Sequence, residues 1–287
     1  MLAWLVLFIL GAIWGASFFF IKVGVADIPP FTFVLGRTLL ASLVLFGVMK
    51  LRGEAFPRSR QLFATLGILG ILNGVIPYTL ITWGETRITS GLASILNAAM
   101  PLFTVVLAHY WTHDERFSTP KVIGVMMGFA GVAVVFIPEL RNGIQAEFWG
   151  QLAVVIAALS YAIATIVARR FLKGVSPVVA SAGQLGSAAL MMLPLSLVFD
   201  QPWTLRPGLP ALAAWLTLAL LGTAFAYTLY YWLLEHTGAT RTSLVTYLLP
   251  IFGVMWGALL LREPIEWEAI VGLVLIIAGV AFVNKKS

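Results

Sequence analysis

The chain contains an internal repeat. When residues 227–250 are aligned with residues 78–101 at an offset of 149, six positions are identical. They are Tyr78, Thr79, Leu80, Trp83, Ser94 and Pro101 in the first copy, and Tyr227, Thr228, Leu229, Trp232, Ser243 and Pro250 in the second. Earlier positions correspond at an offset of 147, where Lys22 meets Arg169 and Pro30 meets Pro177. An order kept along most of a chain is typical of a duplicated unit. We expect two related halves, residues 1–143 and 144–287.

Each half holds five apolar stretches of a length that suits a membrane-spanning helix, which needs about 20 mostly apolar residues. Because 60% of the residues are hydrophobic, 10% are charged and the mean hydropathy is +0.97, lipid is the expected surrounding for most of the chain. The stretches are continuous, whereas spanning strands alternate in polarity. The predicted fold is therefore an all-α integral membrane protein. Its ten transmembrane helices are expected at 2–21, 31–49, 62–84, 89–110, 121–137, 149–169, 178–199, 210–233, 240–261 and 267–284.

The loops indicate how the chain is oriented. Twelve Lys and Arg residues fall on the side of the N-terminus and five on the other side. Basic loops tend to stay in the cytoplasm, so both termini are predicted to be cytoplasmic. Since five spans per half is an odd number, the second half enters from the opposite face. Two inverted-topology repeats are typical of secondary transporters, which bind substrate near the midplane and alternate access to it.

Polar side chains follow one face of the fourth predicted span. Ser90, Ser94, Asn97 and Pro101 recur at steps of four, three and four, and Thr246 and Pro250 echo them in the ninth span. Such a stripe suits a cavity wall, and it also suits close packing of small residues between helices. Both interpretations remain open from the sequence.

Aromatic and other polar side chains inside the spans are the remaining candidates for substrate contact. The deep aromatic residues could line a pocket or simply pack in the core. Asn73 and Gln184 are candidates to hydrogen-bond a zwitterion. Arg37 could meet a substrate carboxylate, extend outward to the interface, or pair with Glu85 at a helix end. The predicted substrate-binding residues are Trp14, Arg37, Asn73, Tyr78, Asn97, Tyr161, Gln184, Tyr227, Thr246 and Tyr247.

Several chemistries are not indicated. All twelve Asp and Glu residues fall at span ends or in loops, so facilitated transport is expected rather than carboxylate-coupled antiport. The chain has no Cys and no GxxxxGK[ST] phosphate loop, and no nucleophile motif has its partner residues. We expect no catalytic residue, metal or cofactor and no nucleic-acid partner. The expected partners are a small-molecule substrate and the lipid bilayer, for a monomer or a homodimer.

These residues also resemble a known family. Ten spans in two repeats, Trp14-Gly15-Ala16-Ser17-Phe18 with Lys22, Pro30 with Arg37, and blocks ending in Pro101/Glu115 and Pro250/Glu263 resemble the EamA-type branch of the drug/metabolite transporter superfamily. The chain is similar to YddG-type aromatic amino-acid exporters. The resemblance implies an exporter of small metabolites, commonly amino acids, in a bacterial-type inner membrane. It also implies a cavity between helices 1–4 and 6–9. The first repeat departs from the family pattern because Asp114-Glu115-Arg116 replaces Leu-Gly-Glu.

Two alternatives remain. The same fold could carry a cationic or lipophilic drug or another metabolite, although a deep carboxylate for a cation is missing from the sequence. A channel or an intramembrane enzyme is the alternative from another class.

Overall fold

The computed structural model describes residues 2–111 and 117–284, and this part of the chain is helical with no strand. Seven helical stretches are long and apolar enough to cross a membrane. Three of them are single helices: α1 (Leu2–Gly24), α2 (Pro30–Leu51) and α9 (Ala146–Phe171). The other four combine shorter elements, as Arg60–Glu85, Ser90–Trp111, Pro177–Asp200 and Leu209–Tyr230.

The composite stretches are broken at definite points. Their parts are α3 (Arg60–Gly70), η1 (Ile71–Val75) and α4 (Ile76–Glu85), then α5 (Ser90–Asn97) and α6 (Met100–Trp111), then α10 (Pro177–Leu195) and η2 (Ser196–Asp200), and finally α11 (Leu209–Thr217), η4 (Leu218–Phe225) and α12 (Ala226–Thr242). The elements η1, η2 and η4 are π-helical, whereas η3 (Pro202–Thr204) is a short 3-10 turn. Short π segments inside helices often mark functional sites.

Three apolar helices are shorter, with 17 residues each: α7 (Thr119–Val135), α13 (Val245–Leu261) and α14 (Trp267–Val283). At 1.5 Å per residue they reach roughly 26 Å, close to the thickness of the hydrocarbon core. The predicted start of the ninth span at residue 240 differs from the structure. There α12 continues to Thr242 across a kink at Gly238, whose φ of 77° suits glycine, so α13 begins only at Val245.

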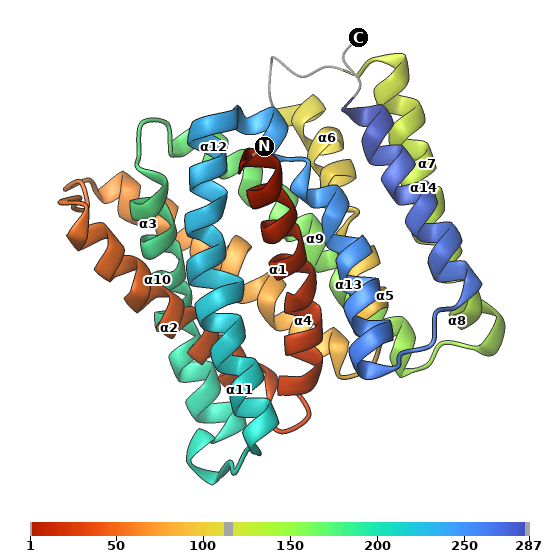
Figure 1. Ribbon diagram of the computed structural model, residues 1–287, viewed down its shortest axis with the longest axis horizontal. Coiled ribbons are helices and arrows are strands. Elements are labelled where there is room, and N and C mark those ends of the chain that lie inside the picture. Colours follow the sequence, from red (N-terminus) through yellow and green to blue (C-terminus); the bar gives the residue numbers. More distant parts are fainter. Residues whose placement is uncertain (1, 112–116, 285–287) are drawn as a thin grey trace.

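The helices pack around a centre, with one pair set to the side (Figure 1). Helix α2 packs along α10, α1 along α13, and α4 along α9, while α7 and α14 pack mainly on each other. The short helix α8 (Ile137–Asn142) connects α7 to the loop before α9. Helix α1 begins and α14 ends at the same end of the bundle, drawn at the top of Figure 1, which we call the terminal end.

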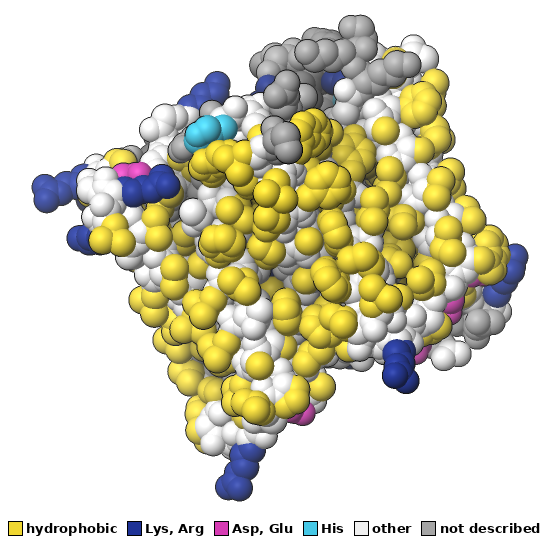
Figure 2. Space-filling view, in the orientation of Figure 1, with side chains coloured by type: hydrophobic (Ala, Val, Ile, Leu, Met, Phe, Trp, Pro, Cys, Tyr) yellow, Lys and Arg dark blue, Asp and Glu magenta, His cyan; other side chains and the backbone are white. Residues whose placement is uncertain are grey.

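The surface agrees with a lipid surrounding. Hydrophobic side chains cover most of the face shown in Figure 2, and Lys and Arg side chains lie toward its edges. Large apolar side chains such as Met126, Leu190 and Phe199 are exposed on the outside of the bundle. The chain is therefore a multi-pass membrane protein by the length, composition and surface of its helices.

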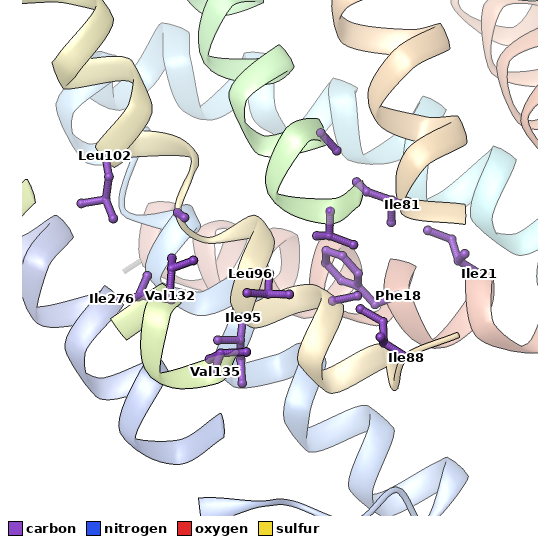
Figure 3. Close-up of a cluster of buried hydrophobic side chains, with 14 of the residues drawn as sticks. Phe18, Ile21, Ile81, Ile88, Ile95, Leu96, Leu102, Val132, Val135 and Ile276 are labelled. Atoms are coloured by element: carbon purple, nitrogen blue, oxygen red, sulfur yellow. The ribbon is translucent and has the colours of Figure 1, made fainter. Parts of the chain in front are cut away.

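A buried apolar cluster holds the side pair to the rest of the bundle (Figure 3). Leu102 of α6 inserts against Gly128 of α7, where an added Cβ would lie 2.2 Å from a Leu102 methyl carbon. The cluster continues through Val132 and Ile276 and extends to Phe18 and Ile81 on α1 and α4. The cluster therefore extends from the α7–α14 pair to the parts of α1 and α4 that lie away from the terminal end.

Candidate functional site

A cavity of about 740 Å³ occupies the centre of the bundle. Its lining comes from both halves of the chain, from α1, α2, α4, α5 and α6 of the first half and from α9, α10, α12 and α13 of the second. Nine of the ten predicted substrate-binding residues line it: Trp14, Arg37, Asn73, Tyr78, Asn97, Tyr161, Gln184, Tyr227 and Thr246. The structure brings these side chains together, and their contact with a substrate stays a prediction.

The cavity runs toward the terminal end and stops at the other. Its lining reaches Leu172, Pro177 and Asn284, which lie where α9 ends, α10 begins and α14 ends. In the other direction it stops at Phe18 and Ile81, which belong to the buried apolar cluster of Figure 3. Among the described residues, the cavity lining therefore extends to the terminal end and not to the opposite end.

Arg37 is the buried cation of the site. Its side chain is 7% exposed, and its guanidinium carbon lies 3.8 Å from the centre of the Tyr78 ring. Its Nε donates a hydrogen bond of 3.1 Å to Oγ1 of Thr223, which sits in the π-helical segment η4. Arg37 thus neither extends to the interface nor forms an ion pair with Glu85, which were two of the three possibilities left by the sequence.

Asn73 and Gln184 face each other across the cavity wall. Asn73 Nδ2 donates to Gln184 Oε1 at 3.1 Å, joining η1 to α10. The π-helical turn places Asn73 there, because the N–H of Ile76 bonds back to the carbonyl of Ile71. The carbonyl of Leu72 is then left without a helical donor, since residue 77 is proline, and Ser160 Oγ donates to it at 2.7 Å.

Replacing Ser160 with alanine should therefore lower the free energy of unfolding by about 1–3 kcal/mol, the cost of leaving a buried carbonyl unpaired. A denaturant titration of the detergent-solubilised protein measures the change. Ser42→Ala is the matched control, because Ser42 is also buried but donates to Leu39 of its own helix. Equal stability of the two variants would contradict this role of Ser160.

Two groups of aromatic rings flank the cavity. Tyr78 and Tyr161 meet edge to face with ring centres 6.4 Å apart. Trp14 meets Tyr227 at 6.4 Å and Tyr230 at 5.5 Å. Tyr230 also lines the cavity and was not among the predicted residues, although it lies one residue from a match in the repeat. These rings form walls suited to a flat or apolar body.

The polar stripe of the fourth predicted span divides between two roles. Ser94 packs against Gly253, where an added Cβ would lie 2.4 Å from Ser94, and its hydroxyl donates to Gly91. Asn97 and Pro101 instead line the cavity, and Asn97 Oδ1 is a buried oxygen without a hydrogen-bond partner among the described residues. Both interpretations of the stripe therefore apply: Ser94 packs between helices, whereas Asn97 and Pro101 line the cavity.

The two neighbouring candidates on α13 differ. Thr246 lines the cavity, and its hydroxyl donates to the carbonyl of Ser243. Tyr247 is not part of the cavity lining, because it points to α14, where its hydroxyl donates to the Val280 carbonyl at 3.0 Å and accepts from Asn284 Nδ2 at 2.7 Å. Consecutive helical residues point about 100° apart, and here Thr246 faces the cavity while Tyr247 faces α14.

Charged side chains close the end opposite the terminal end. Glu263 accepts hydrogen bonds from the N–H and hydroxyl of Ser90, at 2.8 and 2.9 Å, and from the N–H of Gly91 at 3.0 Å. It therefore caps the N-terminus of α5 from a separate segment of the chain. Lys22 Nζ donates to the carbonyls of Glu85 and Ile88, at 2.6 and 2.7 Å, beyond the end of α4. Glu115, the counterpart of Glu263 in the first repeat, lies outside the described residues.

Glu85 corrects one assumption made from the sequence. It ends α4, as a residue at a span end should, yet its side chain is 0% exposed and neither carboxyl oxygen has a hydrogen-bond partner among the described residues. The absence of acids deep in the spans is therefore not an absence of buried acids. Sequence position alone could not reveal this, because burial at a helix end depends on what packs over it.

Helices, surface and cavity together define a multi-pass membrane protein built around a large central cavity. The chain belongs to the EamA-like transporter family, whose family model matches residues 1–137 and 148–285. It is thus a membrane transporter, and transporters of this kind are not enzymes.

Individual relatives agree with this family. The chain is 29% identical to the uncharacterized transporter YoaV of Bacillus subtilis, over 95% of this chain and 92% of the relative. It is 26% identical to the uncharacterized inner membrane transporter YedA of Escherichia coli, over 92% of this chain and 85% of the relative. One solved structure matches with a TM-score of 0.70 at 17% identity, over 98% of this chain and 96% of that chain, which supports the fold alone.

Proposed function

We propose that this protein is an inner-membrane carrier that exports small metabolites, in particular amino acids, by alternating access to the central cavity. The observation that carries the proposal is the cavity itself, which brings nine predicted side chains from both halves together and is closed at one end. The relative YedA is named as an inner membrane transporter, which supports the same location here. With both termini in the cytoplasm, as the basic loops predict, a cavity that extends to the terminal end would correspond to an inward-facing state.

The packing supports ten spanning helices in two inverted repeats, residues 1–143 and 144–287. The pairing of α1 with α13 corresponds to that of α9 with α5 and α6, and α4 on α9 corresponds to α12 on α1. The π-helical segments η1 and η4 also correspond, because η1 shifted by the repeat offset of 149 residues falls within η4. The two ranges matched by the family model divide the chain in the same way. Rocking of two such halves would expose the cavity alternately to each side.

Aromatic or broad amino-acid specificity is supported by the chemistry of the lining. The rings of Trp14, Tyr78 and Tyr161 suit a flat side chain, while Arg37 and the Asn73–Gln184 pair suit polar backbone groups. A cationic drug as substrate is the second candidate. It is less well supported, because the described residues that line the cavity include no Asp or Glu.

The driving force is a separate question. Facilitated transport was expected because the sequence places every acid at a span end or in a loop. The complete burial of Glu85 removes the basis of that expectation. Comparing export with and without an imposed pH gradient decides between facilitated and proton-coupled flux.

Counterflow exchange of labelled phenylalanine in proteoliposomes tests the proposed function. The wild-type protein should show saturable exchange, and Tyr78→Ala and Gln184→Ala should reduce it by about tenfold, as expected for loss of an aromatic contact or a polar anchor. Tyr110→Ala is the control, since Tyr110 is 72% exposed and lies outside the cavity lining.

Exchange that is unaffected by both cavity variants would contradict a site at this cavity. No exchange of any amino acid would contradict amino-acid transport and favour the second candidate, which labelled cationic drugs then test in the same vesicles.

A further inference from the structure

The cavity contains a buried positive charge without a counter-ion. Arg37 is 7% exposed, and its described contacts are the neutral Thr223 hydroxyl and the face of the Tyr78 ring. No described carboxylate forms an ion pair with its guanidinium. Burying an unpaired charge is costly, and buried charges are ordinarily paired. An arginine held open in this way is suited to a partner that arrives with the substrate.

The contacts of Arg37 leave the two terminal nitrogens of its guanidinium group available for a ligand. Thr223 occupies Nε, and stacking on Tyr78 fixes the plane of the guanidinium. The remaining donors are those on the two terminal nitrogens, which bind a carboxylate through two parallel hydrogen bonds. Arg37 also lines the cavity, so these donors are within reach of a molecule that enters from the terminal end.

The same cavity offers nothing of opposite charge for an ammonium group. Its other described lining side chains are neutral, and the buried acceptor without a partner, Asn97 Oδ1, is an amide oxygen. Glu85 acts on Arg37 electrostatically, but it is wholly buried beyond the cavity and does not line it. A neutral acceptor can accept a hydrogen bond from an amide N–H or from an ammonium, but it does not neutralise the charge of the ammonium.

Net charge then ranks the ligands. With Arg37 contributing one positive charge, a bound monocarboxylate leaves the cavity neutral, a zwitterion leaves it at +1, and an organic cation leaves it at +2. Uncompensated charge is disfavoured in a cavity whose mostly apolar walls lower the local dielectric constant. The order of binding should therefore be anion, zwitterion, cation for molecules with the same aromatic body.

We propose that the cavity selects aromatic monocarboxylates that lack a free ammonium group, with Arg37 binding the carboxylate and Asn97 accepting from a neutral N–H. This inference rests on the proposed transport through the cavity and narrows its substrate class. Free amino acids remain ligands, but weaker ones than their N-acylated counterparts.

Three probes with one benzyl skeleton test the inference: N-acetylphenylalanine, phenylalanine and phenylalaninamide, which carry net charges of −1, 0 and +1 at about pH 6. Binding to the purified protein is measured by quenching of tryptophan fluorescence, to which Trp14 in the cavity wall contributes. Competition against labelled phenylalanine is measured by counterflow in proteoliposomes. N-Acetylphenylalanine should bind about tenfold more tightly than phenylalanine, and phenylalaninamide should bind at least about tenfold more weakly than phenylalanine, because each step adds one uncompensated charge.

Arg37→Gln should reduce the affinity for N-acetylphenylalanine by about 100-fold and abolish the ranking, since a charge-assisted bidentate contact is lost. Arg37→Lys keeps the positive charge but cannot form the bidentate contact, so the order of affinities should persist while each ligand binds more weakly. This variant replaces Arg37→Gln in the test if the glutamine variant fails to fold. Arg87→Gln is the matched control. Arg87 is also stacked on an aromatic ring, at 3.6 Å from the Trp83 centre, but lies outside this cavity.

The outcomes separate this inference from the proposed function. If phenylalanine exchanges and N-acetylphenylalanine binds no better than phenylalanine, the anion preference is wrong and amino-acid transport stands. If neither compound binds or exchanges, both proposals are wrong. Both proposals are supported if the predicted order of affinities is found in the wild-type protein and in Arg87→Gln and is lost in Arg37→Gln.

Discussion

Replacing Gly279 with alanine is expected to lower the free energy of unfolding by about 3 kcal/mol, because the new methyl group has no space to occupy. A Cβ at this position would lie 2.5 Å from the Gly124 carbonyl oxygen and 2.6 Å from the Gly128 nitrogen. These are backbone atoms, so no side-chain rotation can relieve the overlap. Helices α7 and α14, which pack mainly on each other, would have to move apart.

A glycine-to-alanine substitution at an uncrowded position should instead raise the free energy of unfolding. An added Cβ at Gly67, inside α3, meets nothing within 4 Å, so Gly67→Ala should stabilise the protein by roughly 0.5–1 kcal/mol through helix propensity. Unfolding of both variants in mixed detergent micelles gives the two free energies. Equal effects at Gly67 and Gly279 would show that α7 and α14 do not depend on this close approach.

The difference between those two glycines also shows how far sequence reasoning extends. Apolar length predicted helices over almost all the stretches that the structure forms, because spanning a membrane leaves few alternatives. The Gly124-xxx-Gly128 spacing in α7 is typical of close helix packing. The partner helix, α14, could not be predicted from spacing, since it lies some 150 residues away along the chain.

Much of the candidate site was predictable for a similar reason. A polar or aromatic side chain deep in an apolar span usually faces the interior of the bundle, so nine of ten candidates share one cavity. Tyr247 was the exception, because periodicity alone does not give the rotation of a helix. The π-helical turns were also not predicted, and they decide where Asn73 and Thr223 point. The η1 turn depends on Pro77 and on a tertiary partner, Ser160, which no local pattern contains.

Opening of the closed end is the other large effect that the structure predicts. Glu263→Gln should loosen this end, because Glu263 accepts three hydrogen bonds from Ser90 and Gly91 at the start of α5. A glutamine amide keeps one acceptor oxygen but places an NH₂ group against donors, and it removes the negative charge that favours a helix N-terminus. Gly257 allows this contact, since a Cβ there would lie 2.4 Å from a Glu263 oxygen. Each lost hydrogen bond to a charged group costs about 1.5–3 kcal/mol.

A cysteine reporter measures the opening directly, because the chain has no native cysteine. Ile81→Cys places one thiol where the cavity stops, at a residue that is 4% exposed. A membrane-impermeant maleimide is added only on the side opposite the termini. Labelling should be at least about tenfold faster when Glu263→Gln is present, because destabilising the closed state by about 1.4 kcal/mol raises the open fraction about tenfold.

Glu266→Gln is the matched control in the same loop. It removes the same charge, but Glu266 is exposed and makes no side-chain cap on α14. Slow labelling in the control and fast labelling in Glu263→Gln would assign closure to the cap on α5. Equal rates in the two variants would mean that the buried apolar cluster of Phe18 and Ile81 closes this end by itself. Alternating access would then depend on separating that cluster, and Glu263 would contribute only to the stability of α5.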